Sequence, residues 1–383
     1  MNHQIKVFSL STARLPGLDL LRAVAIVWVM LFHSFLVGGL GPDFSWLSRY
    51  GWAGVDIFFV LSGFLIGTQV FAPLQRSEPL RFGPFYARRA WRILPAFAAV
   101  LTIYTWFPGL REAPGLQPWW QFATFTVNLF IDYDRNQAFS HAWSLCVEEH
   151  FYLVFPLLAY ALTRRSSVLK CAALWASLAA LGIVLRGTVW LHDAAMDTQR
   201  NWFIEDIYYP TWMRMDGLIM GVMLAALRVY RPRLWAQVLE RSNICLILGM
   251  ATCGLAFYLF RNRTGLLANT LGWPALSSGM GLLVIAGASN RSLIGRWRFP
   301  GAEWIAAASY SLYLSHKLVF HFVSENLVPW MPQSGFLHFL TYALSALAGG
   351  AALHYLVERP FLAWRDHLAT TPRGGALSTG VAG

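Results

Sequence analysis

The sequence predicts an all-α integral membrane protein with about ten transmembrane helices and both termini in the cytoplasm. Its composition, its apolar segments and the distribution of its basic residues favour this fold class. Of the 383 residues, 56% are hydrophobic and only 13% are charged, whereas soluble domains are about 25% charged. The net charge is +11, but the basic residues lie in short segments between apolar runs. We therefore expect a lipid bilayer as a partner and no nucleic acid.

Ten apolar segments approach the length of a transmembrane helix, which is roughly 20 residues. They cover residues 17–38, 54–72, 93–108, 146–163, 171–190, 212–229, 243–260, 266–287, 303–324 and 336–357. The third segment is short and the sixth contains charged residues, so ten is an approximate count.

The lysines and arginines predict the orientation. If the N-terminus is inside, 21 of them lie in inner segments and 8 in outer segments. Cytoplasmic segments of membrane proteins carry the excess of basic residues, so this bias favours both termini inside and an even number of helices.

The chain is expected to form a single membrane domain over residues 1–366. Residues 367–383 are small and glycine-rich, which predicts a disordered tail. The N-terminal residues lack an apolar core followed by a cleavage site, so the first helix is expected to be its own insertion signal. The four cysteines lie in or beside apolar runs without metal-like spacing. They predict neither a disulfide framework nor a metal site.

Arg22 and His33 interrupt the first apolar segment and are eleven residues apart. Eleven residues are close to three helical turns, so both side chains share one helix face and lie roughly 16 Å apart along the axis. A charge inside a membrane is costly unless it is paired or hydrated, which makes this face a candidate functional site. The predicted topology places Arg22 toward the cytoplasm and His33 toward the outside.

Residues 51–67 combine small residues with one acid. Gly51, Gly54, Ser62, Gly63 and Gly67 are spaced to allow close helix packing. Asp56 lies at the expected outer end of its helix, at the depth of His33. It either orients the imidazole or caps the helix.

Three arginines, Arg88, Arg89 and Arg92, occupy the expected cytoplasmic entry of the third segment. Their spacings of three and four residues put Arg92 on a helix face with the other two. The cluster is either an ordinary basic loop or a phosphate-binding site, since guanidinium groups bind phosphate oxygens with two hydrogen bonds each.

Glu148 and Glu149 open the fourth apolar segment, near Trp143 and Ser144. We expect Trp143, Ser144 and Glu149 to line the acceptor site. Acids at a helix N-terminus are stabilised by the helix dipole, which accounts for one of the two. A carboxylate at the depth of His33 could form a dyad, in which the acid orients the imidazole and His33 acts as general base.

Arg214 and Asp216 are two residues apart on one helix and therefore do not face each other. Each needs a partner from elsewhere, either in a substrate cavity or in a buried ion pair.

The ninth segment contains four polar groups that we expect to line the site. Tyr310, Tyr313 and Lys317 follow helical spacing, and His316 lies beside Lys317. Histidine and lysine together in mid-membrane favour a functional role.

In order along residues 15–362, these motifs resemble the large membrane acyltransferase family three, the multispanning bacterial O-acyltransferases of surface polysaccharides and related acceptors. The matching pieces are LDLLRAVAIVWVMLFH, GVDIFFVLSGFLI, RRAWRILP, HAWSLCVEEHFYL, RMDGLIMG, YSLYLSH and ERPF. The family's usual WSLSVEEQFYL has Cys146 and His150 here.

The resemblance implies a protein of the bacterial inner membrane with no permanently bound cofactor. It would take an acyl-CoA co-substrate, commonly acetyl-CoA, from the cytoplasm and acylate an outer hydroxyl, as in O-acetylation of a cell-envelope polysaccharide. The acceptor would be a saccharide or a lipid-linked saccharide.

The implied donor site is Arg22, Arg88, Arg89 and Arg92, and the implied catalytic group is His33 with Glu148 or Asp56. Direct transfer and an acyl-histidine intermediate both fit. Intramembrane Arg, His and Glu also suit a proton-coupled transporter or exporter of a small polar metabolite. No repeat symmetry is visible in the sequence to support that alternative.

Overall fold

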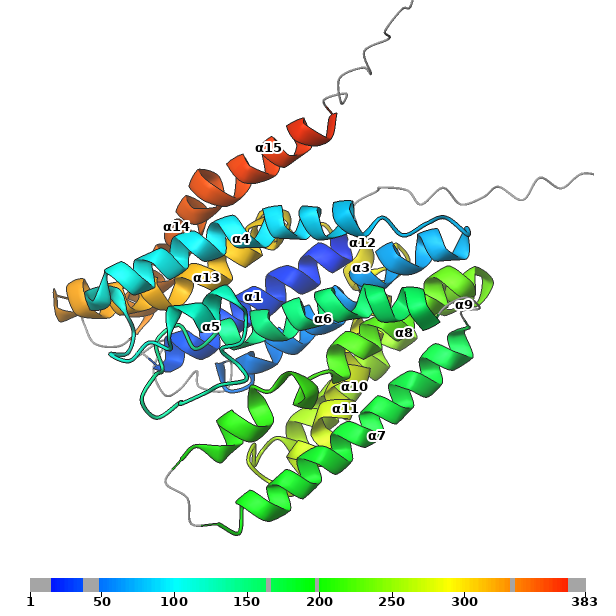
Figure 1. Ribbon diagram of the computed structural model, residues 1–383, viewed down its shortest axis with the longest axis horizontal. Coiled ribbons are helices and arrows are strands. Elements are labelled where there is room, and N and C mark those ends of the chain that lie inside the picture. The colour runs from blue at the N-terminus through cyan, green and yellow to red at the C-terminus, as the bar shows by residue number, and fades with distance from the viewer. Residues whose placement is uncertain (1–14, 37–47, 163–166, 197–199, 331–334, 371–383) are drawn as a thin grey trace, which may run out of the picture.

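The computed structural model describes residues 15–36, 48–162, 167–196, 200–330 and 335–370, and helices make up most of this part of the chain (Figure 1). Within these ranges, the only extended pairing is an isolated bridge between Leu116 and Ala138. The predicted all-α fold class is confirmed for the described residues.

Each of the ten predicted apolar segments contains a helix. These helices are α1 (Pro16–Leu36), α3 (Gly54–Gln75), α4 (Phe82–Trp106), α6 (Ala142–Leu162), α7 (Val168–Asp193), α8 (Asp216–Tyr230), α10 (Ser242–Leu259), α11 (Trp273–Gly287), α13 (Ala302–Asn326) and α14 (Phe336–Leu353). Shorter elements connect them, including α5 (Trp119–Ala123), α9 (Pro232–Glu240), α12 (Leu293–Arg296) and the π-helices η4 (Phe203–Tyr208), η6 (Ala268–Gly272) and η8 (His354–Glu358).

Six helical segments in the described part of the chain are long and apolar enough to cross a membrane. They are Pro16–Ser34, Gly51–Gln75, Val168–Asp193, Ser242–Leu259, Ala268–Gly287 and Phe336–Leu368. Helices α4, α6, α8 and α13 fall outside this set. Helix α8 has only 15 residues, α4 contains three arginines, and α13 contains two glutamates and a lysine. The protein is therefore a multi-pass membrane protein.

Helices α3 and α8 pack with their backbones in direct contact, as the small residues of α3 predict. A Cβ atom added at Gly63 would lie 2.0 Å from the carbonyl oxygen of Leu218. In the same way, a Cβ at Gly221 would lie 2.2 Å from the carbonyl oxygen of Val60. Any side chain at these two positions would push the helices apart.

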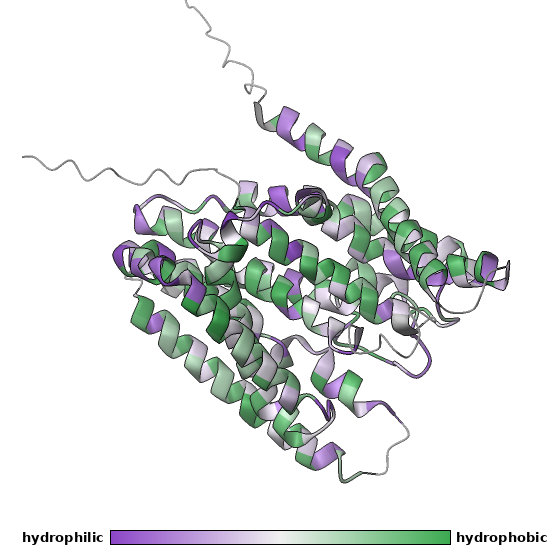
Figure 2. Cartoon of the chain, turned by 180° about the vertical axis from the view of Figure 1, so that it is seen from behind, coloured by the Kyte–Doolittle hydropathy of each residue, from purple (hydrophilic) through white to green (hydrophobic). Residues whose placement is uncertain are grey.

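Helix α7 lies at the edge of the bundle (Figure 1) and buries only Gly182, Arg186 and Asp193. Most of its residues are hydrophobic (Figure 2), and several of its apolar side chains are exposed, including Leu169 at 78%. Such a surface suits contact with lipid.

Helix α15 (Arg359–Thr370) follows η8 and extends away from the bundle (Figure 1). It contains residues 367–370, the first four of the segment expected to be a disordered tail. The rest of that segment, residues 371–383, lies outside the described residues.

We predict that Gly63→Ala destabilises the protein, because the new Cβ meets the Leu218 carbonyl with no room to relax. Overpacking of this kind costs about 1–3 kcal/mol. The measurement is the melting temperature of the detergent-solubilised protein. Gly254→Ala is the matched control, since a Cβ there has nothing within 4 Å and alanine favours the helix. Equal melting temperatures for the two variants would contradict the close α3–α8 contact.

Candidate active site

Helix α1 carries Arg22 and His33, both of them half-buried. The Arg22 end faces a cavity between α1, α3, α4, α6 and α13, with a volume of about 150 Å³. Polar groups from these five helices line it: Arg22, Ser62, Gln69, Arg89, Arg92, Ser144, Glu148, Glu149, Tyr152, Ser309, Tyr310 and Tyr313. The cavity thus collects many residues that are far apart in the sequence.

Arg22, Arg89 and Arg92 bring three guanidinium groups to the cavity. None of the three forms an ion pair with a described carboxylate. Arg89 lies over the ring of Tyr152, with Cζ 4.3 Å from the ring centroid, and its buried Nε has no hydrogen-bond partner in the described structure. Two carboxylates, Glu148 and Glu149, line the same cavity, so the three guanidinium groups leave a formal excess of one positive charge. This excess favours an anionic ligand.

Arg88 does not line the cavity. Its side chain is exposed, because residue 88 is about 100° around the helix from Arg89. The predicted donor cluster is therefore reduced to two arginines of α4, joined by Arg22 of α1.

Glu148 lies in the cavity and not beside His33, which corrects the expected dyad. Its Oε1 accepts a hydrogen bond from Ser62 Oγ (3.0 Å) and its Oε2 accepts one from Tyr152 Oη (2.5 Å). The reason is the start of α6, which begins at Ala142 rather than at residue 146. Glu148 is then about 9 Å along the helix axis from that start. Neither Ser62 nor Tyr152 was predicted to be a site residue.

Asp56 does not orient His33 either. Its Oδ1 accepts a hydrogen bond of 2.8 Å from Arg214 Nη2, and both side chains are buried. The N-terminus of α3 has no side-chain cap, so the capping alternative is wrong as well.

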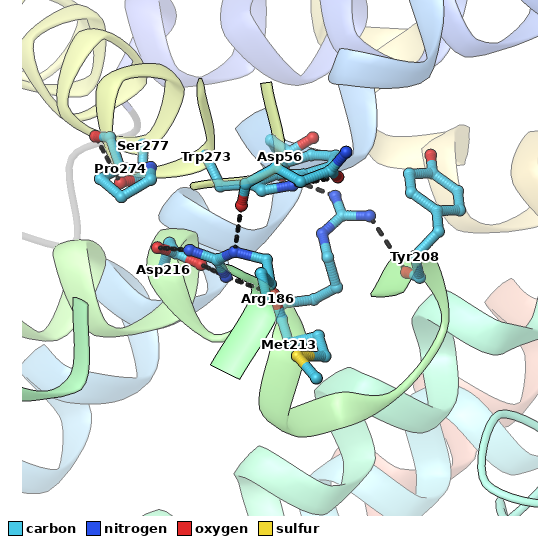
Figure 3. Close-up of polar contacts among 10 residues, drawn as sticks. Asp56, Arg186, Tyr208, Met213, Asp216, Trp273, Pro274 and Ser277 are labelled. Atoms are coloured by element: carbon cyan, nitrogen blue, oxygen red, sulfur yellow. Dashed lines mark hydrogen bonds and ion pairs between the residues drawn. The ribbon is translucent and has the colours of Figure 1, made fainter. Parts of the chain in front are cut away.

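Asp216 forms the second buried ion pair, with Arg186 of α7 (Figure 3). Two hydrogen bonds of 2.8 and 3.1 Å join the groups. Arg186 also donates to the backbone oxygens of Met213 and Asn269. The prediction that Arg214 and Asp216 have separate partners is confirmed. Each forms a buried ion pair with a residue of another helix, and neither pair lines the cavity.

Aromatic rings surround Arg214. Its Cζ lies 3.9 Å from the ring centroid of Trp273, 4.5 Å from Tyr208 and 5.0 Å from Trp143. Trp143, expected in the acceptor site, therefore packs on this ion pair and does not line the cavity. Arg263, in the loop before η6, contacts the same ring of Tyr208, and burial lowers the pKa of its guanidinium group.

Three histidines, His33, His141 and His316, lie close together at the His33 end of α1. His33 Nδ1 lies 2.9 Å from His316 Nε2. The ring centroid of His141 is 5.0 Å from that of His316 and 6.5 Å from that of His33. Sequence reasoning did not single out His141, although it is the first residue of the HAWSLCVEEHFYL motif that carries the two glutamates.

Lys317 points away from the cavity. Its Nζ donates to Ser140 Oγ over 2.9 Å and lies 3.5 Å from Glu112 Oε1. Glu112 was also not predicted, because it belongs to a loop about 200 residues earlier in the chain. The lysine charge therefore has its own partner beside the histidines.

Ser144 and Tyr313 join the cavity to the histidines. Both line the cavity, and their hydroxyl groups are 2.7 Å apart. Tyr313 Oη also donates to the backbone oxygen of His141 over 2.9 Å. The cavity thus ends one side chain away from the histidine cluster. Tyr310, which donates to the Ile93 carbonyl, also lines the cavity wall.

The fold and these buried polar groups define a multi-pass membrane protein with an internal polar cavity beside a histidine cluster. Residues 15–355 match the acyltransferase domain family, and the chain belongs to this family. The family resemblance seen in the sequence is confirmed.

Curated relatives have O-acetyltransferase names. The chain is 29% identical to the peptidoglycan O-acetyltransferase OatA of Listeria monocytogenes over 330 residues, which cover 79% of this chain and 48% of the relative. It is 27% identical to the O-acetyltransferase OatA of Staphylococcus aureus over 338 residues, covering 82% and 52%. The chain spans about half the length of the curated relatives it matches. No solved structure matches this chain.

We predict that the Asp56–Arg214 pair serves stability rather than catalysis. Arg214→Met leaves a buried carboxylate alone, which costs about 3–5 kcal/mol. The double variant Asp56→Leu with Arg214→Met should recover part of this loss, since no lone charge remains. Melting temperature is the measurement, and Glu78→Gln in the exposed Arg76–Glu78 pair is the control. A stable Arg214→Met protein without acyltransferase activity would contradict the assignment.

Proposed function

We propose that this protein is an O-acetyltransferase of the bacterial inner membrane. It moves an acetyl group from cytoplasmic acetyl-CoA to a hydroxyl of a saccharide outside. One observation carries the proposal: a cavity lined by three arginines that form no ion pair with a described carboxylate adjoins a histidine cluster inside one helix bundle. Peptidoglycan is the proposed acceptor, because a relative is named for that activity.

The charge and size of the cavity support acetyl-CoA as the donor. Its phosphates would bind Arg22, Arg89 and Arg92, since guanidinium groups bind phosphate through charge-assisted hydrogen bonds. The cavity, of about 150 Å³, extends from these arginines to Ser144 and Tyr313. We therefore propose that it takes the pantetheine arm and its thioester, and that the nucleotide stays at the cytoplasmic mouth.

The proposed topology has ten transmembrane helices and both termini in the cytoplasm, supported by the excess of basic residues in inner segments. In this orientation, the Arg22 end of α1 is the donor side and the His33 end is the acceptor side. The acetyl group would pass Ser144 and Tyr313 to reach the histidines. The hydrogen bond between these two hydroxyl groups would open as the thioester enters.

The proposed chemical step is direct transfer. The acceptor oxygen attacks the thioester carbonyl carbon, and its proton passes to the free nitrogen of His33. The carbon–sulfur bond then breaks, and the departing thiolate takes the proton from His33. The products are an acetyl ester and CoA. His33 acts as general base and then as general acid in this scheme.

We expect His33→Ala to lower acetyl transfer by about 10²- to 10⁴-fold, the usual contribution of a general base. The assay uses the purified protein in liposomes, radiolabelled acetyl-CoA and disaccharide–peptide fragments of peptidoglycan. A melting temperature close to that of the wild type would show that the variant is folded. Unchanged transfer by this folded variant would overturn the assignment of His33.

Arg89→Ala should raise the KM for acetyl-CoA by about 10-fold or more, because a charge-assisted hydrogen bond contributes about 1.5–3 kcal/mol. The value of kcat should change little, since phosphate contacts stabilise substrate and transition state alike. Arg81→Ala is the matched control, as Arg81 is exposed at the start of α4. A large fall in kcat at unchanged KM would place Arg89 in the chemical step and contradict donor binding.

A further inference from the structure

We infer that His316 is a positioning residue, which holds His33 in the tautomer that has a proton on Nδ1 and a free lone pair on Nε2. The inference rests on the proposed function, in which His33 is the general base. It assigns to the histidine of α13 the orienting role that the sequence favours for a carboxylate.

The backbone of α13 fixes the proton on His316. Its Nδ1 lies 2.7 Å from the carbonyl oxygen of Tyr313 and 3.2 Å from that of Leu312. A carbonyl oxygen can only accept a hydrogen bond, so Nδ1 of His316 must carry the hydrogen. Because both acceptors belong to the same helix as His316, the ring orientation is determined locally.

The surroundings of His316 keep it neutral. Its side chain has 0% exposure, and Lys317 follows it in the chain. A second proton would create a buried cation beside another cation, which is strongly unfavourable. Nε2 of His316 therefore keeps its lone pair and can only accept a hydrogen bond.

The proton on His33 follows from these two steps. The contact of 2.9 Å joins Nε2 of His316 to Nδ1 of His33. Since His316 accepts, His33 must donate, and its hydrogen lies on Nδ1. Nε2 of neutral His33 then has the lone pair that a general base needs. When His33 takes the acceptor's proton on Nε2, its Nδ1–H remains bonded to His316, and the charged ring keeps its orientation.

His141 packs beside the other two histidines but forms no hydrogen bond with His33 in the described structure. Its Nε2 lies 3.3 Å from the carbonyl oxygen of Leu314, and its ring packs edge-on against His316. The carboxylate closest to this region among the described contacts, Glu112, lies against Lys317 and not against an imidazole. No described carboxylate accepts from His33. A backbone interaction with Val29 of its own helix also acts on the ring, and His316 is the side chain that orients it from a neighbouring helix.

Three substitutions of His316 separate orientation from packing. In Gln, the terminal amide can place an acceptor oxygen where Nε2 was. Asn is one bond shorter and reaches only the Nδ1 position, and Phe fills the volume without an acceptor. His321→Gln is the matched control, since His321 lies on the same helix α13 without a described contact to His33.

We expect His316→Phe and His316→Asn to lower kcat by about 10- to 100-fold, the typical effect of losing the orienting partner of an imidazole. His316→Gln should recover most of this loss. The KM for acetyl-CoA should stay the same in all three, because the arginines of the cavity are untouched. Wild-type kcat in His316→Phe, or equal values for the Asn and Gln variants, would overturn the inference.

A second measurement reads the tautomer without turnover. Nitrogen-15 NMR of protein labelled at histidine identifies the protonated ring nitrogen, and His33→Gln assigns the signal of His33 by difference. We expect Nδ1–H in the wild-type protein and loss of this preference in His316→Phe. An Nε2–H tautomer in the wild type would overturn the inference whatever the activity. Activity retained in His33→Ala would instead overturn the proposed function, so the two failures are distinguishable.

Discussion

The structure depends on the pairing of charges inside an apolar bundle, most clearly at Arg186. Its guanidinium group is fully buried and makes four hydrogen bonds, two of them to Asp216. Helix α7 buries only two other residues, and Arg186 joins it to Asp216 of α8 and to Asn269 of η6. A Cβ at Gly182 would lie 3.1 Å from Arg186 Nη1, so the glycine provides the space for the guanidinium group. An unpaired charge at this depth would cost several kcal/mol, so α7, α8 and the turn before α11 are held in one arrangement.

The need of a buried charge for a partner also separates the structural arginines from the functional ones. Arg186 and Arg214 have carboxylate partners, and neither lines the cavity. Arg22, Arg89 and Arg92 line it and form no ion pair with a described carboxylate. All five are arginines in or near apolar helices, and only the presence of a partner tells the two groups apart. The unpaired group is the one for which an anionic substrate lowers the energy of the protein.

Local periodicity explains which parts could be predicted from the sequence. Helical spacing alone puts Arg22 and His33 on one face of α1. Composition alone locates the ten apolar segments, each of which contains a helix. Partners from distant segments could not be derived in this way. Arg214 and Asp56 are 158 residues apart, and the spacing of residues along the chain does not show which of the many charged residues will form a pair. The error at Glu148 had a local cause. Four additional residues at the start of α6 move this carboxylate from the His33 end of the bundle to the arginines.

A histidine partner has a different electrostatic consequence from a carboxylate. A carboxylate beside His33 would stabilise the protonated imidazole, and the proton would be slow to leave. The neutral ring of His316 orients His33 through its lone pair but adds no counter-charge, and Lys317 keeps a positive charge close by. In the proposed reaction, the protonated state of His33 is therefore short-lived. The proton is then passed readily to the departing thiolate, which completes the transfer and returns His33 to the tautomer that can act as a base again.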